Sequence, residues 1–383
     1  MRGKSLSIVL PCLNEAETIG VCVGKAFRAL EAMGVPGEVI VADNGSRDGS
    51  REIASKLGAK VVDQPVKGYG AAYLKGLEAA SGEYIVMGDS DDTYDFLDLP
   101  RLIAGLDAGA DMVLGSRFKG KILPGAMSFS HRYIGNPILS GILNLFFGSR
   151  ISDCHSGFRA FTREAVRGLH LSTLGMEFAS EMIVSALRNK LKIAEVPITY
   201  YPRKGRSKLE SLSDAWRHMR FMLLFSPNWL FLAPGLLLFG GGLILFLNTA
   251  LGWLRLFGHV FDIHAMIFFA MFTLAGFQVL ATGLCAKAFA VREGFASPSR
   301  FVEGVFKALN LERALAWGSL MFLAGFAGSA YIVGLWVKIH FVGYFLMPKQ
   351  SLFCVVLMIM GMQTIFTAFF ISLLRLPRIP RGA

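Results

Sequence analysis

The pattern of apolar and polar positions divides the chain into two unlike halves. Up to about residue 210, short apolar runs alternate with segments in which apolar residues recur at helical spacing. After about residue 229, apolar residues form nearly continuous blocks. Short apolar runs predict buried strands, whereas blocks of about 20 apolar residues predict membrane-spanning helices. We therefore expect a mixed α/β domain followed by a membrane region.

In the first half, the predicted strands and helices alternate. The strands are expected at 5–10, 38–42, 59–62, 84–87, 111–114 and 193–200, and the helices at 15–33, 48–57, 68–81, 99–108 and 176–191. Alternation of this length favours a mainly parallel sheet with helices on both faces.

Four apolar blocks in the second half are long enough to cross a membrane. They cover 229–253, 265–288, 314–337 and 351–374. Four such blocks in series favour membrane spans over buried core helices. The cations that flank them are Lys287, Arg292, Arg300, Lys307 and Arg313 in the middle loop, Arg375, Arg378 and Arg381 in the tail, and Arg255, Lys338 and Lys349 in the two other loops. Because cytoplasmic loops carry the excess of cations, we expect a multi-pass protein of the cell membrane with its globular domain, middle loop and tail in the cytoplasm.

Residues 209–225 differ from both halves. Leu209, Leu212, Trp216, Met219 and Leu223 recur at helical spacing among charged residues, which predicts an amphipathic helix at a membrane interface. The alternative is a helix packed on the globular domain, but a span follows at once. The expected organisation is therefore a catalytic domain at 1–208, an interfacial region at 209–228, a four-helix membrane domain at 229–376 and a tail at 377–383.

Composition agrees with this division. The chain is 53% hydrophobic and 17% charged, with a net charge of +11. Its basic residues lie at the membrane flanks and in one dense loop, which favours phosphate-bearing substrates and lipid headgroups over nucleic acid. The five cysteines show no metal-binding spacing, so we expect them to be reduced. The first four residues run straight into a strand, so no signal peptide is expected.

An acidic cluster, Asp89-Ser90-Asp91-Asp92, directly follows the apolar run 84–87. Carboxylates at the carboxyl end of a buried strand lie where α/β sheets bind ligands. Two of them can share Mg²⁺ or Mn²⁺, which usually also holds substrate phosphates. Taken alone, the cluster also fits an Asp-rich turn that caps the next helix.

Polar groups also follow the first two expected strands, in Pro11-Cys12-Leu13-Asn14-Glu15 and Asp43-Asn44-Gly45-Ser46. Groups at successive strand ends form the nucleotide pocket of an open α/β sheet. Lys67-Gly68-Tyr69-Gly70 places a cation and two glycines at a helix N-terminus, which suits a phosphate. The basic loop 201–208 either binds lipid headgroups or closes over a diphosphate.

Together these motifs resemble the family 2 glycosyltransferases, and among them the polyprenyl-phosphate hexose synthases. The resemblance covers residues 5–225, and the motifs that carry it are Pro11–Glu15, Asp43–Ser46, Asp89-Ser90-Asp91, Gly115-Ser116-Arg117, Ser156-Gly157-Phe158-Arg159 and Arg203-x-Gly205-x-Ser207-Lys208. It implies a GT-A fold, a nucleotide-sugar donor, a polyprenyl or dolichyl phosphate acceptor and a divalent cation.

The resemblance also implies residue roles. Pro11, Asn14, Glu15, Asp43 and Lys67 would bind the donor nucleotide, with Asp89 contacting the donor, Asp91 binding Mg²⁺ or Mn²⁺, Arg203, Ser207 and Lys208 clamping the diphosphate, and Arg117 and Arg132 binding the acceptor phosphate. Many members carry Gln two residues after the metal-binding Asp. Thr93 stands there in this chain, so Thr93, Asp92 or water would complete the metal site.

A lipid monophosphate is anionic near neutral pH and needs little help from a base, so positioning and charge stabilisation would supply most of the catalysis. In-line attack predicts inversion at the anomeric carbon. Asp153 would orient the acceptor, act as a base or simply form a turn. Glu177 and Glu181 would face sugar hydroxyls or be ordinary helix carboxylates.

Two other functions share the membrane spans. A processive polysaccharide synthase would carry Gln-x-x-Arg-Trp before the spans, where this chain has Asp214-Ala215-Trp216-Arg217. A non-catalytic scaffold or lipid transporter would have lost the acidic cluster and the basic loop, and both are present. The pattern leaves open the sugar, the base of the donor and whether the protein is a homo-oligomer.

Overall fold

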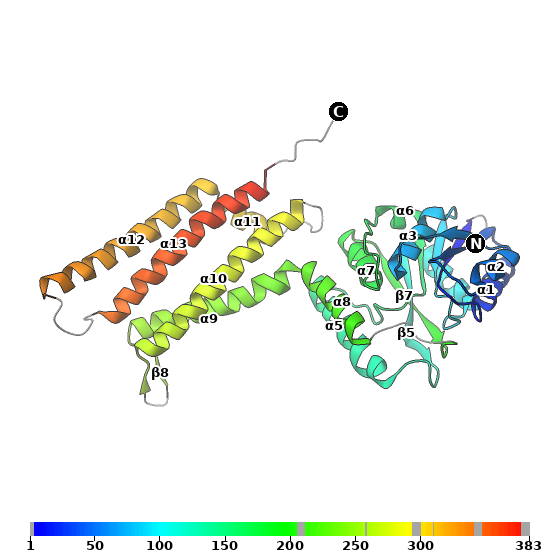
Figure 1. The fold of residues 1–383 in the computed structure, drawn as a ribbon, viewed down its shortest axis with the longest axis horizontal. Coiled ribbons are helices and arrows are strands. Elements are labelled where there is room, and N and C mark those ends of the chain that lie inside the picture. The colour runs from blue at the N-terminus through cyan, green and yellow to red at the C-terminus, as the bar shows by residue number, and fades with distance from the viewer. Residues whose placement is uncertain are drawn as a thin grey trace. The chain divides into compact units, whose positions relative to one another are not determined.

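The computed structural model describes residues 4–204, 211–256, 259–292, 300–308, 310–340 and 347–376. The chain forms two compact units, Met1–Met222 and Leu223–Ala383. The first contains a large sheet, and the second contains long apolar helices (Figure 1).

The first unit is built on a seven-stranded sheet in the order β3-β2-β1-β4-β6-β5-β7. Its strands are β1 (Leu6–Cys12), β2 (Gly37–Asp43), β3 (Lys60–Asp63), β4 (Tyr84–Met87), β5 (Met112–Ile122), β6 (Arg159–Thr162) and β7 (Ile193–Tyr200). β6 runs antiparallel between β4 and β5, and the other described pairings are parallel. A mainly parallel sheet was predicted, but β6 was not, because four residues in a polar context give no clear period.

Helices cover both faces of this sheet. Those of the first unit are α1 (Ile19–Met33), α2 (Ser50–Lys56), α3 (Tyr69–Ala79), α4 (Leu99–Asp107), α5 (Asn136–Phe147), α6 (Arg163–Gly168), α7 (Phe178–Arg188) and α8 (Ser211–Leu224). α1 contacts α2 and α4, whereas α3 contacts α7, so two groups of helices form. α5 and α6 were not predicted from the sequence.

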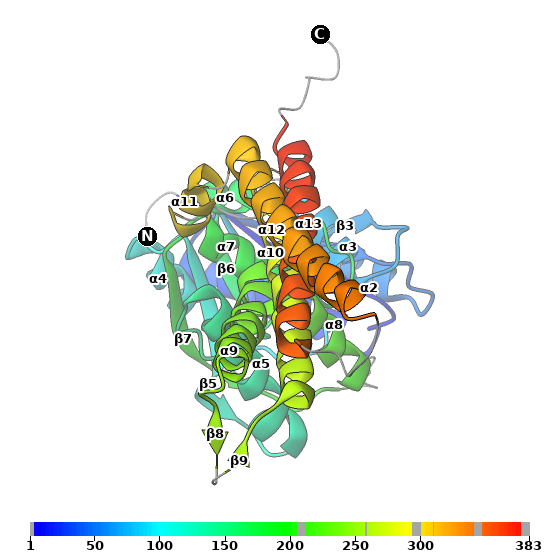
Figure 2. The same ribbon diagram turned by 90° about the vertical axis from the view of Figure 1, so that its left-hand side faces the viewer.

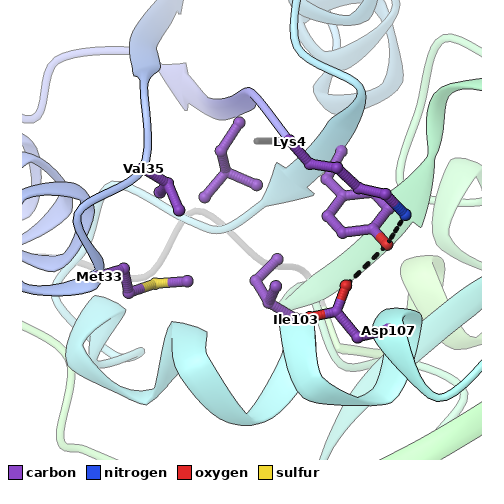
Figure 3. A pocket seen from close by; sticks show the side chains of 7 residues that line it. Lys4, Met33, Val35, Ile103 and Asp107 are labelled. Carbon is purple, nitrogen blue, oxygen red and sulfur yellow. Dashed lines mark hydrogen bonds between the residues drawn. The ribbon is translucent and has the colours of Figure 1, made fainter. Parts of the chain in front are cut away.

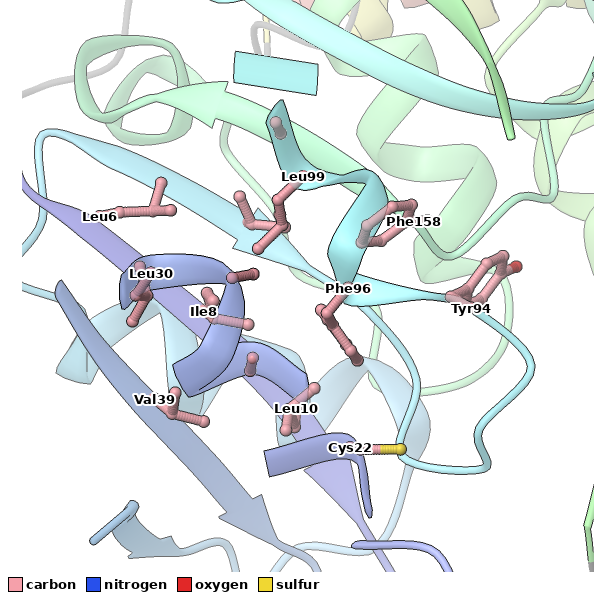
Figure 4. Close-up of a cluster of buried hydrophobic side chains, with 14 of the residues drawn as sticks. Leu6, Ile8, Leu10, Cys22, Leu30, Val39, Tyr94, Phe96, Leu99 and Phe158 are labelled. Carbon is pink, nitrogen blue, oxygen red and sulfur yellow. The ribbon is translucent and has the colours of Figure 1, made fainter. Parts of the chain in front are cut away.

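The core lies between the sheet and the helices α1 and α4. Ile8 and Leu10 of β1 are fully buried and pack with Leu30 of α1 and Phe96 before α4 (Figure 4). Burying each such side chain contributes about 1.5–3 kcal/mol to folding. This core holds β1 and β4 rigidly, so the loops at their carboxyl ends start from fixed positions.

The second unit contains four helices long and apolar enough to cross a membrane. The candidate spans are Asn228–Ala250, which includes α9 (Ala233–Ala250), α10 (Ile263–Arg292), α12 (Leu311–Lys338) and α13 (Pro348–Leu374). The predicted spans are confirmed by these helices. α9 packs on α10 and α12 packs on α13 (Figure 2). At Gly276 of α10 a side chain would collide with the backbone of α9 at Phe239, so glycine allows the two helices to approach closely.

Shorter elements complete the second unit. α11 (Arg300–Ala308) buries Val302 and Phe306 against α10 and α13, and a small hairpin, β8 (Arg255–Leu256) with β9 (His259–Val260), joins α9 to α10.

α8, the predicted interfacial helix, belongs to the first unit up to Met222. His218, Phe221 and Met222 are buried, whereas Trp216 and Leu224 are 60% and 63% exposed. The helix therefore packs on the globular unit through one side and presents large apolar side chains on another.

A cavity of about 120 Å³ opens at the amino-terminal ends of β1 and β4. The ammonium of Lys4, the hydroxyl of Tyr84 and the carboxylate of Asp107 form a hydrogen-bonded chain beside it (Figure 3). The acidic cluster follows the opposite, carboxyl end of β4, so this cavity is separate from the candidate site.

Two helix glycines test the packing of the first unit. At Gly76 of α3 an added Cβ would collide with Val9 of β1, whereas at Gly24 of α1 nothing lies within 4 Å. Gly76→Ala should lower the free energy of unfolding by about 1–3 kcal/mol through overpacking. Gly24→Ala should raise it by up to about 1 kcal/mol through helix propensity. Thermal unfolding of the two variants measures this, and equal effects would contradict the packing described.

Candidate functional site

The loops after β1, β2 and β4 meet at one edge of the sheet. The Ser90 hydroxyl donates a hydrogen bond to the carbonyl oxygen of Pro11 over 2.5 Å. The Asn44 amide donates to the carbonyl oxygen of Cys12 over 2.8 Å. These bonds join the three loops that sequence analysis selected, and the acidic cluster lies among them.

Asp89 lies at the inner end of the acidic cluster and is half-buried. The hydroxyls of Tyr69 and Tyr73, both on α3, each donate a hydrogen bond to Asp89 Oδ1 over 3.1 Å. Burial raises the pKa of Asp89 to about 6, and the negative charge of Asp91 adds to the rise. A nearby positive charge would therefore stabilise the ionised form of this carboxylate.

Asp91 is 8% exposed and is held by its own loop. The amide and hydroxyl of Thr93 donate to Asp91 Oδ1 over 3.2 and 2.6 Å. On its other side, Asp91 Oδ2 lies 3.3 Å from Nη1 of Arg203, whose Nη2 donates to Glu15 Oε1 over 3.0 Å. Arg203 thus bridges the loop after β1 and the acidic cluster.

Asp92 has a different role from Asp91. It adopts φ +61°, and its carboxylate receives the ammonium groups of Lys25 on α1 and Lys204 over 2.8 and 2.6 Å. Burial would raise the pKa of Asp92, but Lys204 and Lys25 outweigh it and lower the value. The sequence does not indicate Lys25 and Lys204 as partners of Asp92, because they lie 67 and 112 residues from it along the chain.

These residues fit a cation that is shared with a ligand. No group of three His, Cys, Asp or Glu side chains in the described part of the chain could enclose a metal ion. Asp89 and Asp91 interact as like charges, so a divalent cation would relieve their repulsion. Mg²⁺ commonly takes one or two carboxylates and completes its shell with phosphates and water. The Thr93 hydroxyl already donates a hydrogen bond to Asp91, so Thr93 is suited to orient the Asp91 carboxylate.

The residues predicted to bind the nucleotide shape the neighbouring turns. Asp43 is fully buried and accepts hydrogen bonds from the amides of Gly45 and Ser46. Asn14 Oδ1 accepts from the amide of Arg47 over 2.8 Å. Asp43 therefore stabilises its own turn after β2, whereas Asn14 joins the loop after β1 to that turn.

Lys67 is also part of this frame. Its ammonium donates to the carbonyl oxygens of Asn44 and Gly45. Side chains at Gly68 and Gly70 would collide with the backbone at Leu174 and Thr173. These contacts give the two glycines a packing role, whereas the sequence suggested that they approach a phosphate.

Arg117 and Asp153 form a buried ion pair. Nε and Nη2 of Arg117 donate to Asp153 Oδ2 and Oδ1 over 2.7 and 2.8 Å, and the Arg117 amide adds a third bond of 3.1 Å. Burial alone would lower the pKa of Arg117, but the Asp153 carboxylate raises it well above its ordinary value. The two residues neutralise each other, which favours a positioning role over a free base and a free phosphate ligand.

Arg132 lies on a separate helical turn, His131–Gly135, and its guanidinium stacks on the Tyr133 ring at 5.3 Å. Phe129, Tyr133 and Ile134 around it are 72%, 58% and 52% exposed. A half-buried cation among exposed apolar side chains suits an amphiphilic partner.

The two helix carboxylates have different surroundings. Glu181 accepts four hydrogen bonds from the amides and hydroxyls of Ser172 and Thr173, so it holds that loop in place. Within the described residues, Glu177 Oε2 is buried without a hydrogen-bond partner. Ser207 and Lys208, also predicted to bind the donor, lie outside the described residues.

Comparison with known proteins assigns the chain to a family. The family model for glycosyl transferase family 2 matches residues 7–169, and the model for the glycosyltransferase family 2 C-terminal transmembrane region matches residues 284–375. The low-salt glycan biosynthesis hexosyltransferase Agl6 of Haloferax volcanii is 42% identical over 375 residues, which cover 96% of this chain and 88% of that protein. The chain is a glycosyltransferase of family 2.

Two further relatives extend the comparison. A dolichyl-phosphate hexose transferase of Haloferax volcanii is 31% identical over 206 residues, covering 54% of this chain and 86% of that protein. A Mycobacterium tuberculosis glucosyl-3-phosphoglycerate synthase, solved in complex with Mn²⁺, uridine diphosphate and glucosyl-3-phosphoglycerate, is 27% identical. The aligned part covers 58% of this chain and 79% of the chain of that synthase, with a TM-score of 0.48.

These findings confirm three expectations. The family, the enzyme class and the GT-A fold followed by four apolar helices are as the sequence predicted. The chain is an integral membrane protein.

The Arg117–Asp153 pair can be tested by removing one charge. Asp153→Asn leaves a buried guanidinium without its counter-charge and should cost about 3–5 kcal/mol of unfolding free energy. Lys119→Gln, on the same strand as Arg117, breaks a half-exposed ion pair with Glu195 and should cost under about 1 kcal/mol. Thermal unfolding compares them. A stable Asp153→Asn protein that has lost only activity would instead support a base.

Proposed function

We propose that the protein transfers a hexose from a nucleotide diphosphate sugar, with UDP or GDP as the nucleotide, to a polyprenyl or dolichyl phosphate. The transfer depends on Mg²⁺ or Mn²⁺ and inverts the anomeric carbon. The observation that carries the proposal is the arrangement of Asp89 and Asp91 at the carboxyl end of β4, bridged by Arg203 to Glu15. It occurs in a family 2 domain that is followed by membrane helices and has a relative named for dolichyl phosphate.

The donor end of the proposed site is the pocket framed by Glu15, Arg203 and the acidic cluster. Arg203 Nε is buried without a hydrogen-bond partner among the described residues, so it keeps a donor for a phosphate oxygen. A divalent cation on Asp89 and Asp91, with Thr93 orienting Asp91, would stabilise the charge of the departing nucleoside diphosphate. Pro11, Asn14, Asp43 and Lys67 shape the loops that enclose the nucleotide. Glu177 would accept a hydrogen bond from a sugar hydroxyl.

At the acceptor end, Arg132 is the proposed phosphate ligand. The exposed Phe129, Tyr133 and Ile134 beside it would contact the lipid chain. The Arg117–Asp153 pair would hold the neighbouring loop, so that the phosphate oxygen approaches the anomeric carbon in line. Because that oxygen is already ionised near neutral pH, no general base is needed.

The proposed topology places this chemistry at one membrane face. The cations after α10, around α11 and at the end of α13 would lie in the cytoplasm with the first unit. Both substrates are then on the same side, with the lipid phosphate at the membrane surface.

The metal assignment is tested with purified full-length enzyme. Asp91→Ala should abolish transfer from radiolabelled nucleotide sugars into the lipid phase at all Mg²⁺ or Mn²⁺ concentrations, because it removes a charged ligand of the cation. Asp107→Asn changes a carboxylate at the opposite ends of the strands and serves as the control. Full activity of Asp91→Ala would overturn the assignment.

The role of Arg203 is tested against its neighbour Lys204. Arg203→Ala should weaken binding of the nucleoside diphosphate about 10- to 100-fold, since a hydrogen bond between charged groups contributes about 1.5–3 kcal/mol. Lys204→Ala removes the same charge but contacts Asp92, so we expect a smaller effect. Isothermal titration of UDP and GDP with Mn²⁺ measures both. A change in lipid binding alone would make Arg203 a headgroup anchor.

A further inference from the structure

Two histidines, the buried His218 and the partly buried His155, join α8 to the loop that carries Asp153. The rings of His155 and His218 meet edge to face, with centroids 4.4 Å apart. His218 lies on α8 and is 5% exposed, whereas His155 lies two residues after Asp153. The pair is therefore a direct contact between the membrane-proximal helix and the proposed acceptor side of the site.

Each histidine is fixed by a second contact. Nδ1 of His218 lies 2.8 Å from the hydroxyl of Ser180 on α7. Nδ1 of His155 lies 3.1 Å from Sγ of Cys154, which accepts a hydrogen bond from the Ser140 hydroxyl on α5. The contact thus ties α8 to two helices and to the loop. Apolar groups would fill such a place equally well, and in some proteins buried polar groups specify one arrangement of the packed elements.

The loop held by this pair also carries Arg159. Its guanidinium is buried and donates hydrogen bonds to the carbonyl oxygens of Ser156, Ala179 and Cys154. The backbone from Asp153 to Arg159 is therefore braced from inside the domain by Arg159 and from α8 by His218. Movement of α8 would reach Asp153 and its partner Arg117 through His155.

We infer that His218 is a positioning residue, which fixes α8 against the Asp153–Arg159 loop and so couples membrane contact of α8 to the acceptor side of the site. The inference rests on the proposed function for its acceptor. His218 touches neither substrate and acts through His155. The exposed Trp216 and Leu224 of the same helix would contact the lipid surface.

The surroundings of the pair favour its uncharged form. The charged and titratable groups near it are Arg117 on β5, Arg159 on β6, His131 on the turn before α5, and Asp153 and Cys154 in the loop, while Glu181 on α7 is bonded to Ser172 and Thr173. Burial lowers the pKa of His218 to about 4, with Arg159 adding to the effect, and burial also lowers the pKa of His155 well below its ordinary value. The pKa values of both histidines fall when α8 packs on the loop. The contact is therefore intact above about pH 6.5 and weakens as pH falls toward 4.

Hydrogen exchange tests the contact without reference to activity. In the full-length protein in lipid nanodiscs, the backbone of residues 211–224 should lose protection roughly tenfold between pH 7 and pH 5, after correction for intrinsic rates. His218→Phe keeps a ring against His155 but cannot take a proton, so its loss of protection should be clearly smaller than in wild type, with only the contribution of His155 left. Arg220→Ala, an exposed change on the same helix, should behave as wild type. Equal pH dependence in wild type and His218→Phe would overturn the role of His218.

Kinetics test the coupling. His218→Ala should raise KM for the polyprenyl phosphate about fivefold or more, as expected for the loss of a hydrogen bond and ring contact, with KM for the nucleotide sugar within about twofold. His218→Phe should recover part of the loss. An unchanged acceptor KM, or an equal rise for both substrates, would overturn the inference. If wild type transfers nothing to polyprenyl phosphate, the proposed function fails, while the exchange data still decide the contact.

Discussion

The first unit depends on the compensation of three carboxylates that crowd the loop after β4. Asp89, Asp91 and Asp92 follow one short buried strand, and like charges this close repel strongly in a poorly solvated setting. Each of the three carboxylates has different partners in the fold. Tyrosine hydroxyls bond to Asp89, Arg203 approaches Asp91, and two lysines bind Asp92. Only Asp89 and Asp91 lack a full counter-charge, so this is where an added cation would be most favoured.

The same compensation organises the segments around the site. Arg203 and Lys204 follow β7, at the far end of the sheet from β1 in the strand order, yet they reach the acidic cluster and Glu15. Arg117 on β5 meets Asp153 after α5, and His155 meets His218 on α8. Charge pairs and polar contacts therefore connect the loops after β1 and β4, the loop of residues 153–159 and the helix that precedes the candidate spans.

Much of this protein could be predicted from local pattern. β4 and β7 were predicted with their observed bounds, and the four spans were found from hydrophobic length alone. The acidic cluster was located because a strand end in a parallel sheet is a ligand edge. The local pattern did not predict β6, whose four residues pair antiparallel between two other strands, or the buried ion pair between Arg117 and Asp153. Both depend on neighbours far along the chain.

The sequence by itself determined the alternation of strands and helices, the membrane helices and the residue types of the site, since periodicity, hydrophobic length and strand-end position are local properties. Tertiary structure decided which of those residues are free to act. Asp92, Asp153 and Glu181 are carboxylates like Asp89, but folding brings cations or amide donors to them from other elements, whereas Asp89 receives two tyrosine hydroxyls and lies beside the charge of Asp91. A carboxylate whose charge is balanced by such partners holds a loop in place. One whose charge is only partly balanced can bind a ligand. Only the folded chain distinguishes the two, because the distinction lies in the partner rather than in the residue.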